Sequence, residues 1–473
     1  MSSGGNVTAV EHFDAIILGS GQCGDPLALA LSAKGKKTAL VERAYLGGTC
    51  SNYGCTPTKT MVASAEVADM ARRAEEYGVR VSDVTVDMAA VRERKRAMVM
   101  KWRNGDEDRL EKAEHVEILR GEGAFVGPKQ VRVKLNAGGE RVLTADWIVI
   151  DTGLRASPPP VDGIESVPYL DNVSIMELDT VPEHLLVLGG GYVGLEFGQM
   201  FRRFGSAVTI VQHGAQLLET EDADVAEEMA KILREDGIEI LLSTKVVSVA
   251  KSTSGVEMMA ESGDGQMRVV SGSHLLAATG RKPNVEALNL AVAGVNTDAH
   301  GFIQVNDKLE TSAAGVYAVG DVTGGPAFTH ISYDDYRVLK ANLLDGGDKS
   351  TRGRMLPYCV FIDPQLGRIG LSEREAAEQG KKVRVARLPM SSVARALETG
   401  RTRGFMKALV DAETDLILGA AVLGEEGGEI MSLIETAMMG GLKYQVLRDG
   451  IWAHPLFSES MNNLFAKFDD GAS

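Results

Sequence analysis

The sequence predicts an α/β protein built from two parallel-sheet units and a third region of strands and helices. A glycine-rich turn between a strand-like apolar run and a helical stretch predicts the two units, once at residues 19–24 and again at residues 189–194. After about Gly346 strands and amphipathic helices continue without such a turn, which predicts the third region. The repeated unit indicates two dinucleotide sites in one chain, the alternative being that one unit is vestigial.

The first unit has the order strand, turn, helix, strand. Residues 13–18 are a short apolar run of the buried-strand type, the glycine turn follows, and residues 26–34 are helical. A second strand at residues 38–41 ends in Glu42. Glycines let the backbone approach a pyrophosphate at the helix N-terminus, and an acid about twenty residues on accepts hydrogen bonds from a ribose. This context makes the motif a strong signal.

The second unit repeats the order but ends differently. Residues 185–188 lead into the turn, the following helix contains Glu196, and the strand at residues 207–211 ends at Gln212. At this position an acid favours NADH through the 2′-hydroxyl, and an arginine favours NADPH through the 2′-phosphate. Gln212, followed by His213, is neither. We expect a slight preference for NADPH, because no carboxylate stands at position 212 to repel the phosphate.

Three further segments complete the predicted elements. Residues 66–76 and 106–114 have the polar faces of solvent-exposed helices that flank the first unit. Residues 257–271 alternate as in a β-meander with polar turns.

Cys50 and Cys55 are separated by four residues within a segment rich in glycine and proline. Two cysteines so placed can close a small disulfide that cycles between oxidised and reduced forms. A structural disulfide is the alternative, although such bridges are typical of small secreted domains. A metal site would need a second pair of ligands. Cys23 and Cys359 are isolated. We expect Cys23 to be a small filler in the glycine turn and Cys359 to be a buried apolar side chain.

The composition excludes several classes of function. The chain has 473 residues and a net charge of −15, which argues against nucleic acid and acidic membrane surfaces as partners. No apolar run is long enough to span a bilayer. The stretch Met1–His12 is polar and lacks the pattern of a secretion signal. We therefore expect a cytoplasmic, reducing setting, where a reactive cysteine pair is more often catalytic than structural.

In this order, the motifs resemble those of the class I pyridine nucleotide–disulfide oxidoreductases, the flavoprotein family of glutathione reductase, dihydrolipoamide dehydrogenase and mercuric reductase. The resemblance covers nearly the whole chain. The matching segments are Gly19–Gly24 with Glu42, Cys50–Cys55, Thr152-Gly153, Gly189–Gly194, Thr279-Gly280-Arg281, Gly320-Asp321, and His454-Pro455 with Glu459. The resemblance implies two Rossmann-like domains and a C-terminal α+β dimerisation domain. The implied boundaries are 1–155 with 285–345 for FAD, 156–284 for NAD(P), and 346–473 for dimerisation.

The resemblance also implies the cofactors, FAD in the first unit and NADPH or NADH in the second. Lys59 matches a lysine that pairs with a glutamate beside the flavin, here Glu196, and Tyr192 matches a gate over the nicotinamide. The implied cofactor-binding residues are Gly19, Gly21, Gly24, Glu42, Thr49, Lys59, Gly123, Ala124, Thr152, Gly153, Gly189, Gly191, Tyr192, Gly194, Gln212, Gly280, Arg281 and Asp321. No resident metal is expected.

By the same resemblance Cys55 is the thiol against the flavin and Cys50 is the exposed thiol that attacks substrate. Thiolate is the reactive form, so a base must take its proton, and histidine suits that role near neutral pH. His454 is the implied base and Glu459 fixes its tautomer. Both belong to the implied dimerisation domain, which predicts a homodimer whose sites are shared between subunits. The chain departs from the family pattern at Leu456 and Asp151.

The substrate is the least determined part of the prediction. Residues 56–60 and 325–330 resemble the mercuric-reductase-like branch, which indicates a small disulfide or a soft metal as substrate. The final segment, residues 465–473, lacks the cysteine pair that hands Hg(II) inward in mercuric reductases. Dihydrolipoamide dehydrogenase is the alternative enzyme, and a flavin-bound redox sensor without turnover is an alternative of another class.

Overall fold

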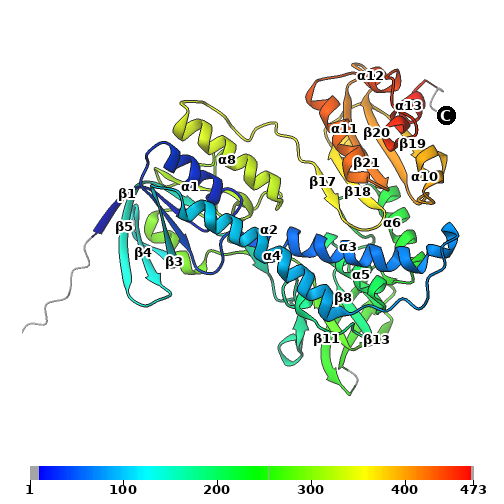
Figure 1. Ribbon diagram of the computed structural model, residues 1–473, viewed down its shortest axis with the longest axis horizontal. Coiled ribbons are helices and arrows are strands. Elements are labelled where there is room, and N and C mark those ends of the chain that lie inside the picture. Colours follow the sequence, from blue (N-terminus) through cyan, green and yellow to red (C-terminus); the bar gives the residue numbers. More distant parts are fainter. Residues whose placement is uncertain (1–9, 254, 470–473) are drawn as a thin grey trace, which may run out of the picture. The chain divides into compact units, whose positions relative to one another are not determined.

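The computed structural model describes residues 10–253 and 255–469, which form two compact units (Figure 1). Among the described residues, the first unit contains 10–60, 92–157 and 280–354, and the second contains the others. The predicted α/β fold class is confirmed, while the division into three domains stays a prediction. The first nine residues of the polar segment Met1–His12 and the last four of the cysteine-free segment lie outside the described residues.

A six-stranded sheet forms the centre of the first unit. Its strands are β1 (Val10–Leu18), β2 (Thr38–Glu42), β3 (Val116–Gly127), β4 (Gln130–Leu135), β5 (Glu140–Ile150) and β16 (Val316–Ala318). β1 lies between β2 and β5 and is parallel to both, and β16 pairs with β5. β4 joins β3 to β5 as an antiparallel strand. Because the parallel strands are buried on both faces, they appear in the sequence as continuous apolar runs.

The helices of the first unit place its functional segments at the ends of the strands. They are α1 (Gly24–Ala33), α2 (Gly48–Asn52), α7 (Leu290–Ala293), α8 (Thr329–Leu344), and the parts of α3 (Cys55–Arg72) and α4 (Met88–Glu111) that fall in this unit. α1 and α8 pack against each other (Figure 1). A short ladder of β6 (Leu154–Ala156) and β15 (Arg281–Pro283) completes the unit. None of the described helices is long and apolar enough to cross a membrane.

The second unit contains a parallel five-stranded sheet in the order β10-β9-β8-β14-β7. Its strands are β7 (Tyr169–Leu170), β8 (His184–Leu188), β9 (Ala207–Val211), β10 (Glu239–Leu241) and β14 (His274–Ala277), with helices α5 (Tyr192–Phe204) and α6 (Ala223–Glu235). The predicted meander is confirmed as an antiparallel sheet of β11 (Thr244–Ser252), β12 (Gly255–Ser262) and β13 (Met267–Gly272).

The C-terminal part of the second unit is an antiparallel five-stranded sheet in the order β17-β18-β21-β20-β19. The strands are β17 (Tyr358–Val360), β18 (Gln365–Gly370), β19 (Val383–Pro389), β20 (Phe405–Asp411) and β21 (Ile417–Gly424). The helices are α9 (Glu373–Glu378), α10 (Ala394–Glu398), α11 (Gly427–Met439), α12 (Tyr444–Arg448) and α13 (Ser460–Ala466). α11 packs on β18 and β21 (Figure 1), and its buried side chains Ile430, Met431 and Ile434 join the apolar core beneath it.

Candidate functional site

The first glycine turn joins the end of β1 to the N-terminus of α1. Gly19 has φ +102°, and a Cβ atom there would lie 2.2 Å from the carbonyl oxygen of Asp151, so glycine is required by both conformation and space. At the end of β2, Glu42 accepts hydrogen bonds from the Ser20 backbone N–H at 3.1 Å and from the Ala44 N–H at 2.7 Å. The carboxylate therefore stands beside the turn, where the sequence predicted a ribose partner.

Asp151, noted in the sequence only as a departure, lies beneath the same turn. Its Oδ2 accepts the backbone N–H of Gly24 at 2.7 Å, so the side chain caps the N-terminus of α1 from the buried side. Burial raises the pKa of Asp151 well above its ordinary value, and the hydrogen bond from Gly24 opposes that shift. A Cβ atom on Gly21 would lie 2.7 Å from the Asp151 carboxylate, which shows how closely this acid fills the turn.

Three side chains predicted to bind the cofactor belong to the first unit. The hydroxyl oxygen of Thr152 is buried and has no hydrogen-bond partner among the described residues. Arg281 lies 3.6 Å from the Asp321 carboxylate. Burial raises the pKa of Asp321 while Arg281 lowers it. A buried hydroxyl without a partner among the described residues fits a polar ligand that supplies the missing hydrogen bond.

The helix that carries Cys50 lies directly against the glycine turn. A Cβ atom on Gly48 would lie 2.8 Å from the Cα atom of Gly21, so only a glycine lets the two backbones approach this closely. Asn52 fixes the short helix by donating to the carbonyl oxygens of Leu46 at 2.8 Å and Gly48 at 2.9 Å. The guanidinium of Arg103 donates to the same Asn52 side chain at 2.8 Å.

Both thiols are reduced, and they interact with each other. The hydrogen bond with Cys55 and then burial raise the pKa of the Cys50 thiol, so one proton is held firmly by the pair. The sulfur of Cys55 also lies 3.3 Å from the hydroxyl of Thr329, the first residue of α8. Cys50 lies within α2 and is partly buried, whereas Cys55 begins α3 and is exposed. The roles predicted for the two thiols stay predictions.

The second glycine turn repeats the first within the second unit. A Cβ atom on Gly194 would lie 2.1 Å from the carbonyl oxygen of Gly189, so the start of α5 packs tightly on the turn. Tyr192 is the first residue of that helix and is partly buried. Glu196 is 4% exposed and accepts the Phe361 backbone N–H at 2.9 Å. Its predicted pairing with Lys59, which belongs to the first unit, stays a prediction.

His454 and Glu459 form a dyad in the C-terminal part of the second unit. Nδ1 of His454 lies 2.8 Å from the Glu459 carboxylate, and the imidazole is 65% exposed. The preceding loop is fixed where Asn462 donates to the carbonyl oxygens of Arg448 at 2.6 Å and Gly450 at 2.9 Å. This geometry leaves the second ring nitrogen available for proton transfer. The prediction that this dyad serves the Cys50 and Cys55 thiols of another subunit stays a prediction.

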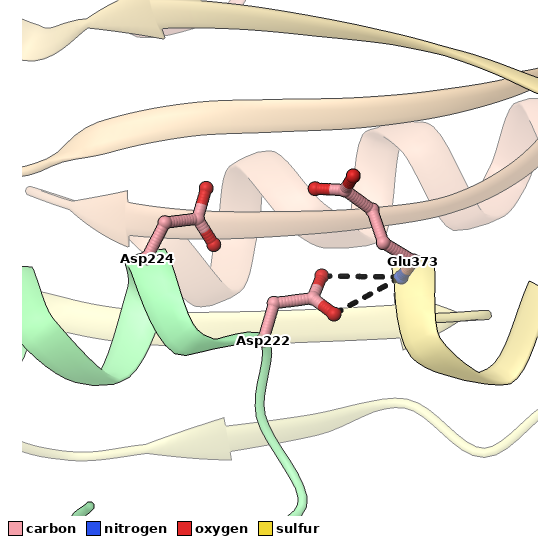
Figure 2. Close-up of side chains that lie close together, drawn as sticks. All are labelled: Asp222, Asp224 and Glu373. Atoms are coloured by element: carbon pink, nitrogen blue, oxygen red, sulfur yellow. Dashed lines mark hydrogen bonds between the residues drawn. The ribbon is translucent and has the colours of Figure 1, made fainter. Parts of the chain in front are cut away.

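A group of three carboxylates has the spacing of a metal site but already contains a cation. Figure 2 shows Asp222, Asp224 and Glu373 pointing toward one another, with ligand oxygens within 4.8 Å. The ammonium of Lys407 lies 2.9 Å from Asp222 and 3.0 Å from Asp224, and it also bonds Glu373. Burial lowers the pKa of Lys407, but these hydrogen bonds outweigh burial and raise the pKa above its ordinary value. The three carboxylates therefore form ion pairs with Lys407.

Replacing Lys407 with Met is expected to lower the free energy of unfolding by about 3–5 kcal/mol, because acids packed around a buried cation lose their partner. Urea unfolding followed by circular dichroism measures the loss. Lys381, an exposed lysine of the same region, provides the control, and Lys381→Met should change the free energy by less than about 0.5 kcal/mol. Equal small effects of both substitutions would show that the cluster is not a stabilising network.

Two family models match consecutive parts of the chain. The pyridine nucleotide-disulphide oxidoreductase model matches residues 13–335, and the dimerisation domain of the same family matches residues 356–465. The chain therefore belongs to the pyridine nucleotide-disulphide oxidoreductases, as the sequence motifs predicted. It is a flavoprotein disulfide reductase that uses FAD and NAD(P)H, and it carries a dimerisation domain.

Individual relatives cover almost the whole chain. The probable pyridine nucleotide-disulfide oxidoreductase RclA of Escherichia coli is 36% identical and covers 97% of this chain and 99% of its own length. Mercuric reductase of Staphylococcus aureus is 32% identical over 98% of this chain and 83% of its own. Dihydrolipoyl dehydrogenase of Thermus scotoductus is 34% identical over 96% of each chain. A solved Cu(II) complex of the HOCl-induced RclA has a TM-score of 0.89 at 35% identity and covers 97% and 99% of the two chains.

The residues of the first unit fit FAD. The turn at Gly19, the carboxylate of Glu42 and the unpartnered hydroxyl of Thr152 would hold its phosphate, ribose and flavin parts. Gly123 lies in β3, where a Cβ atom would come within 2.8 Å of the Leu18 side chain, and its predicted contact with the cofactor stays a prediction. The individual contacts of these residues stay predictions.

Sequence reasoning missed two residues of the first unit. Thr329 was part of a segment noted only for its family resemblance, although its hydroxyl contacts the Cys55 sulfur. Asp151 was noted only as a departure, although it caps α1. The sequence showed only that one residue has a hydroxyl and the other a carboxylate. Neither residue lies near its partner in the sequence, so the contacts could not be predicted.

Proposed function

We propose that this protein passes electrons from NAD(P)H through the flavin to Cys50 and Cys55, and from there to a thiol-bound Cu(II) or Hg(II) ion. The observation that carries the proposal is the direct interaction of the Cys50 and Cys55 thiols, the first of them on a short helix packed against the glycine turn. Vicinal soft sulfur ligands suit soft metals and their reduced forms. Support for a metal comes from RclA, which has been solved as a Cu(II) complex, and from relatives named mercuric reductase.

The proposed reaction balances with one nicotinamide. NAD(P)H and two Cu(II) ions give NAD(P)⁺, one H⁺ and two Cu(I) ions, or one Hg(II) ion gives Hg(0). When bound, FAD supplies the group that accepts a hydride and passes its electrons onward. The chain's own residues bind the metal and manage the protons. The Cys50 thiol keeps its proton until a base or a metal displaces it, because the hydrogen bond with Cys55 and burial raise its pKa. In this proposal His454, oriented by Glu459, is the base.

A small disulfide is the second candidate substrate. It is favoured by the similarity to dihydrolipoyl dehydrogenases, which match this chain at 33–34% identity. A disulfide would be attacked by the Cys50 thiolate, and His454 would protonate the departing thiol. A sensor without turnover differs from both candidates, because it would accept electrons once and stop.

The test is steady-state NAD(P)H oxidation by the FAD-loaded protein with Cu(II), Hg(II), lipoamide, glutathione disulfide and a quinone as separate acceptors. Each metal is supplied in excess small thiol. We expect multiple turnovers, with kcat/KM for a metal–thiol complex at least about tenfold above that for either disulfide, a difference of ~1.4 kcal/mol in transition-state stabilisation. Stopped-flow spectra distinguish turnover from a single reduction.

Reactions of the metals with NAD(P)H in the absence of protein provide the background, and a Cu(I) chelator verifies the product. Faster turnover with lipoamide than with either metal would show that the substrate is a disulfide and not a metal ion. A single reduction followed by no turnover with every acceptor would favour the sensor.

A further inference from the structure

The side chain of Gln212 is buried, and both of its polar atoms bind groups of the protein. Oε1 of Gln212 accepts the backbone N–H of Gly190, within the second glycine turn, at 2.8 Å in a buried position. Its amide nitrogen points the other way and donates to the carboxylate of Glu219 at 2.9 Å. Gln212 thus links the turn to an acid seven positions later in the chain.

The backbone holds Glu219 in this place. Leu218 has φ +43°, and its N–H donates to the carbonyl oxygen of Gly190 at 3.1 Å, which turns the chain back toward the glycine turn. The carbonyl oxygen of Glu219 accepts from Arg374 at 3.1 Å. A Cβ atom on Gly214 would lie 2.1 Å from the Glu219 carboxylate, so the acid packs over the segment that follows β9. The carboxylate is therefore anchored at both its backbone and its side chain.

We propose that Glu219 selects NADH over NADPH as the electron donor. The end of β9 beside the glycine turn is where the adenosine ribose of a dinucleotide lies in this type of fold. The Glu219 side chain is 53% exposed and can accept hydrogen bonds from the ribose hydroxyls. A 2′-phosphate at the same place would meet a negative charge. Although position 212 carries no acid, Glu219 supplies a carboxylate there, which removes the reason for expecting NADPH.

His213 does not reverse this selection. Its Nε2 lies 3.8 Å from the Glu219 carboxylate, so any positive charge on the imidazole is opposed at short range by that acid. The proposed selection depends on the use of a pyridine nucleotide by the family and not on the substrate proposed above.

The test measures binding and not turnover. Dissociation constants of NAD⁺ and NADP⁺ for the oxidised, FAD-loaded protein are determined by titration calorimetry, and 5′-AMP with 2′,5′-ADP isolates the ribose end. We expect native protein to bind NAD⁺ and 5′-AMP more tightly. Glu219→Gln should tighten NADP⁺ and 2′,5′-ADP by about tenfold, since removal of one nearby charge relieves the repulsion of the phosphate.

Glu227→Gln is the matched control, because Glu227 is an exposed acid of α6 in the same unit, and this variant should leave both constants unchanged. Rising salt should reduce the preference of the native protein for 5′-AMP over 2′,5′-ADP but should change that of Glu219→Gln less, since salt screens exposed charges. Tighter binding of NADP⁺ by native protein, an unchanged ratio in Glu219→Gln, or a salt-independent preference would overturn the proposal. Since no electron acceptor is present, failure of the proposed substrate leaves this result unaffected.

Discussion

Cys55→Ser is expected to reduce steady-state electron transfer by about a thousandfold or more, a loss of roughly 4 kcal/mol in transition-state stabilisation. A serine hydroxyl neither forms the disulfide nor holds a soft metal, so the path from flavin to acceptor ends there. The same loss is expected for Cys50→Ser. NAD(P)H oxidation with the best acceptor of the panel measures both variants, and Cys359→Ser, outside the pair, should retain native turnover.

Spectra separate the roles of the two thiols. Cys50→Ser should show a long-wavelength charge-transfer band without added reductant, because the remaining Cys55 thiolate is predicted to lie against the oxidised flavin. Cys55→Ser should lack that band under all conditions. Identical spectra for the two variants would show the assignment to be wrong.

Mixing two inactive variants should restore activity if the sites are shared between subunits. His454→Ala is expected to lower turnover about a hundredfold to ten-thousandfold, the usual contribution of a general base. In random mixtures with Cys50→Ser subunits, half of the dimers are heterodimers and each has one intact site. About a quarter of all sites should therefore recover activity, as expected for a two-fold oligomer.

Purified heterodimers sharpen the measurement, because half of their sites should then be active. Glu459→Gln keeps the shape of the dyad but removes the charge that orients the His454 imidazole, and it should shift the pH profile of turnover. Heterodimers without activity would place the thiols and the imidazole in one subunit.

The local parts of the fold could be predicted from the sequence. Strand, glycine turn and helix follow one another within about thirty residues, a length typical of a βαβ unit. The predicted strand at residues 13–18 is confirmed within β1, and the predicted helix at residues 26–34 largely coincides with α1. The helix that contains residues 106–111 begins much earlier, at Met88, because mixed polar residues give no clear apolar stripe there.

Long-range contacts of the site could not be predicted from the sequence. Thr329 meets Cys55 across 274 positions and Asp151 meets Gly24 across 127, distances over which sequence spacing carries no information. Glu219 is closer to Gln212 in sequence, but it reaches the ribose end only because the backbone at Leu218 turns with positive φ. A glutamate seven positions after the expected ribose-binding position cannot be recognised from the sequence until the turn at Leu218 is known.

Because the backbones of Gly48 and Gly21 lie so close together, the dithiol segment and the first glycine turn can only be transferred to another protein together. A side chain at Gly48 would push the cysteine helix away, whatever the two cysteines did. Transplanting this redox pair onto another dinucleotide-binding protein would therefore fail if only the cysteines were copied. The recipient protein must also have glycine at the matching position of its own turn. A search for natural or designed recipients should therefore begin with the glycines and add the cysteines afterwards.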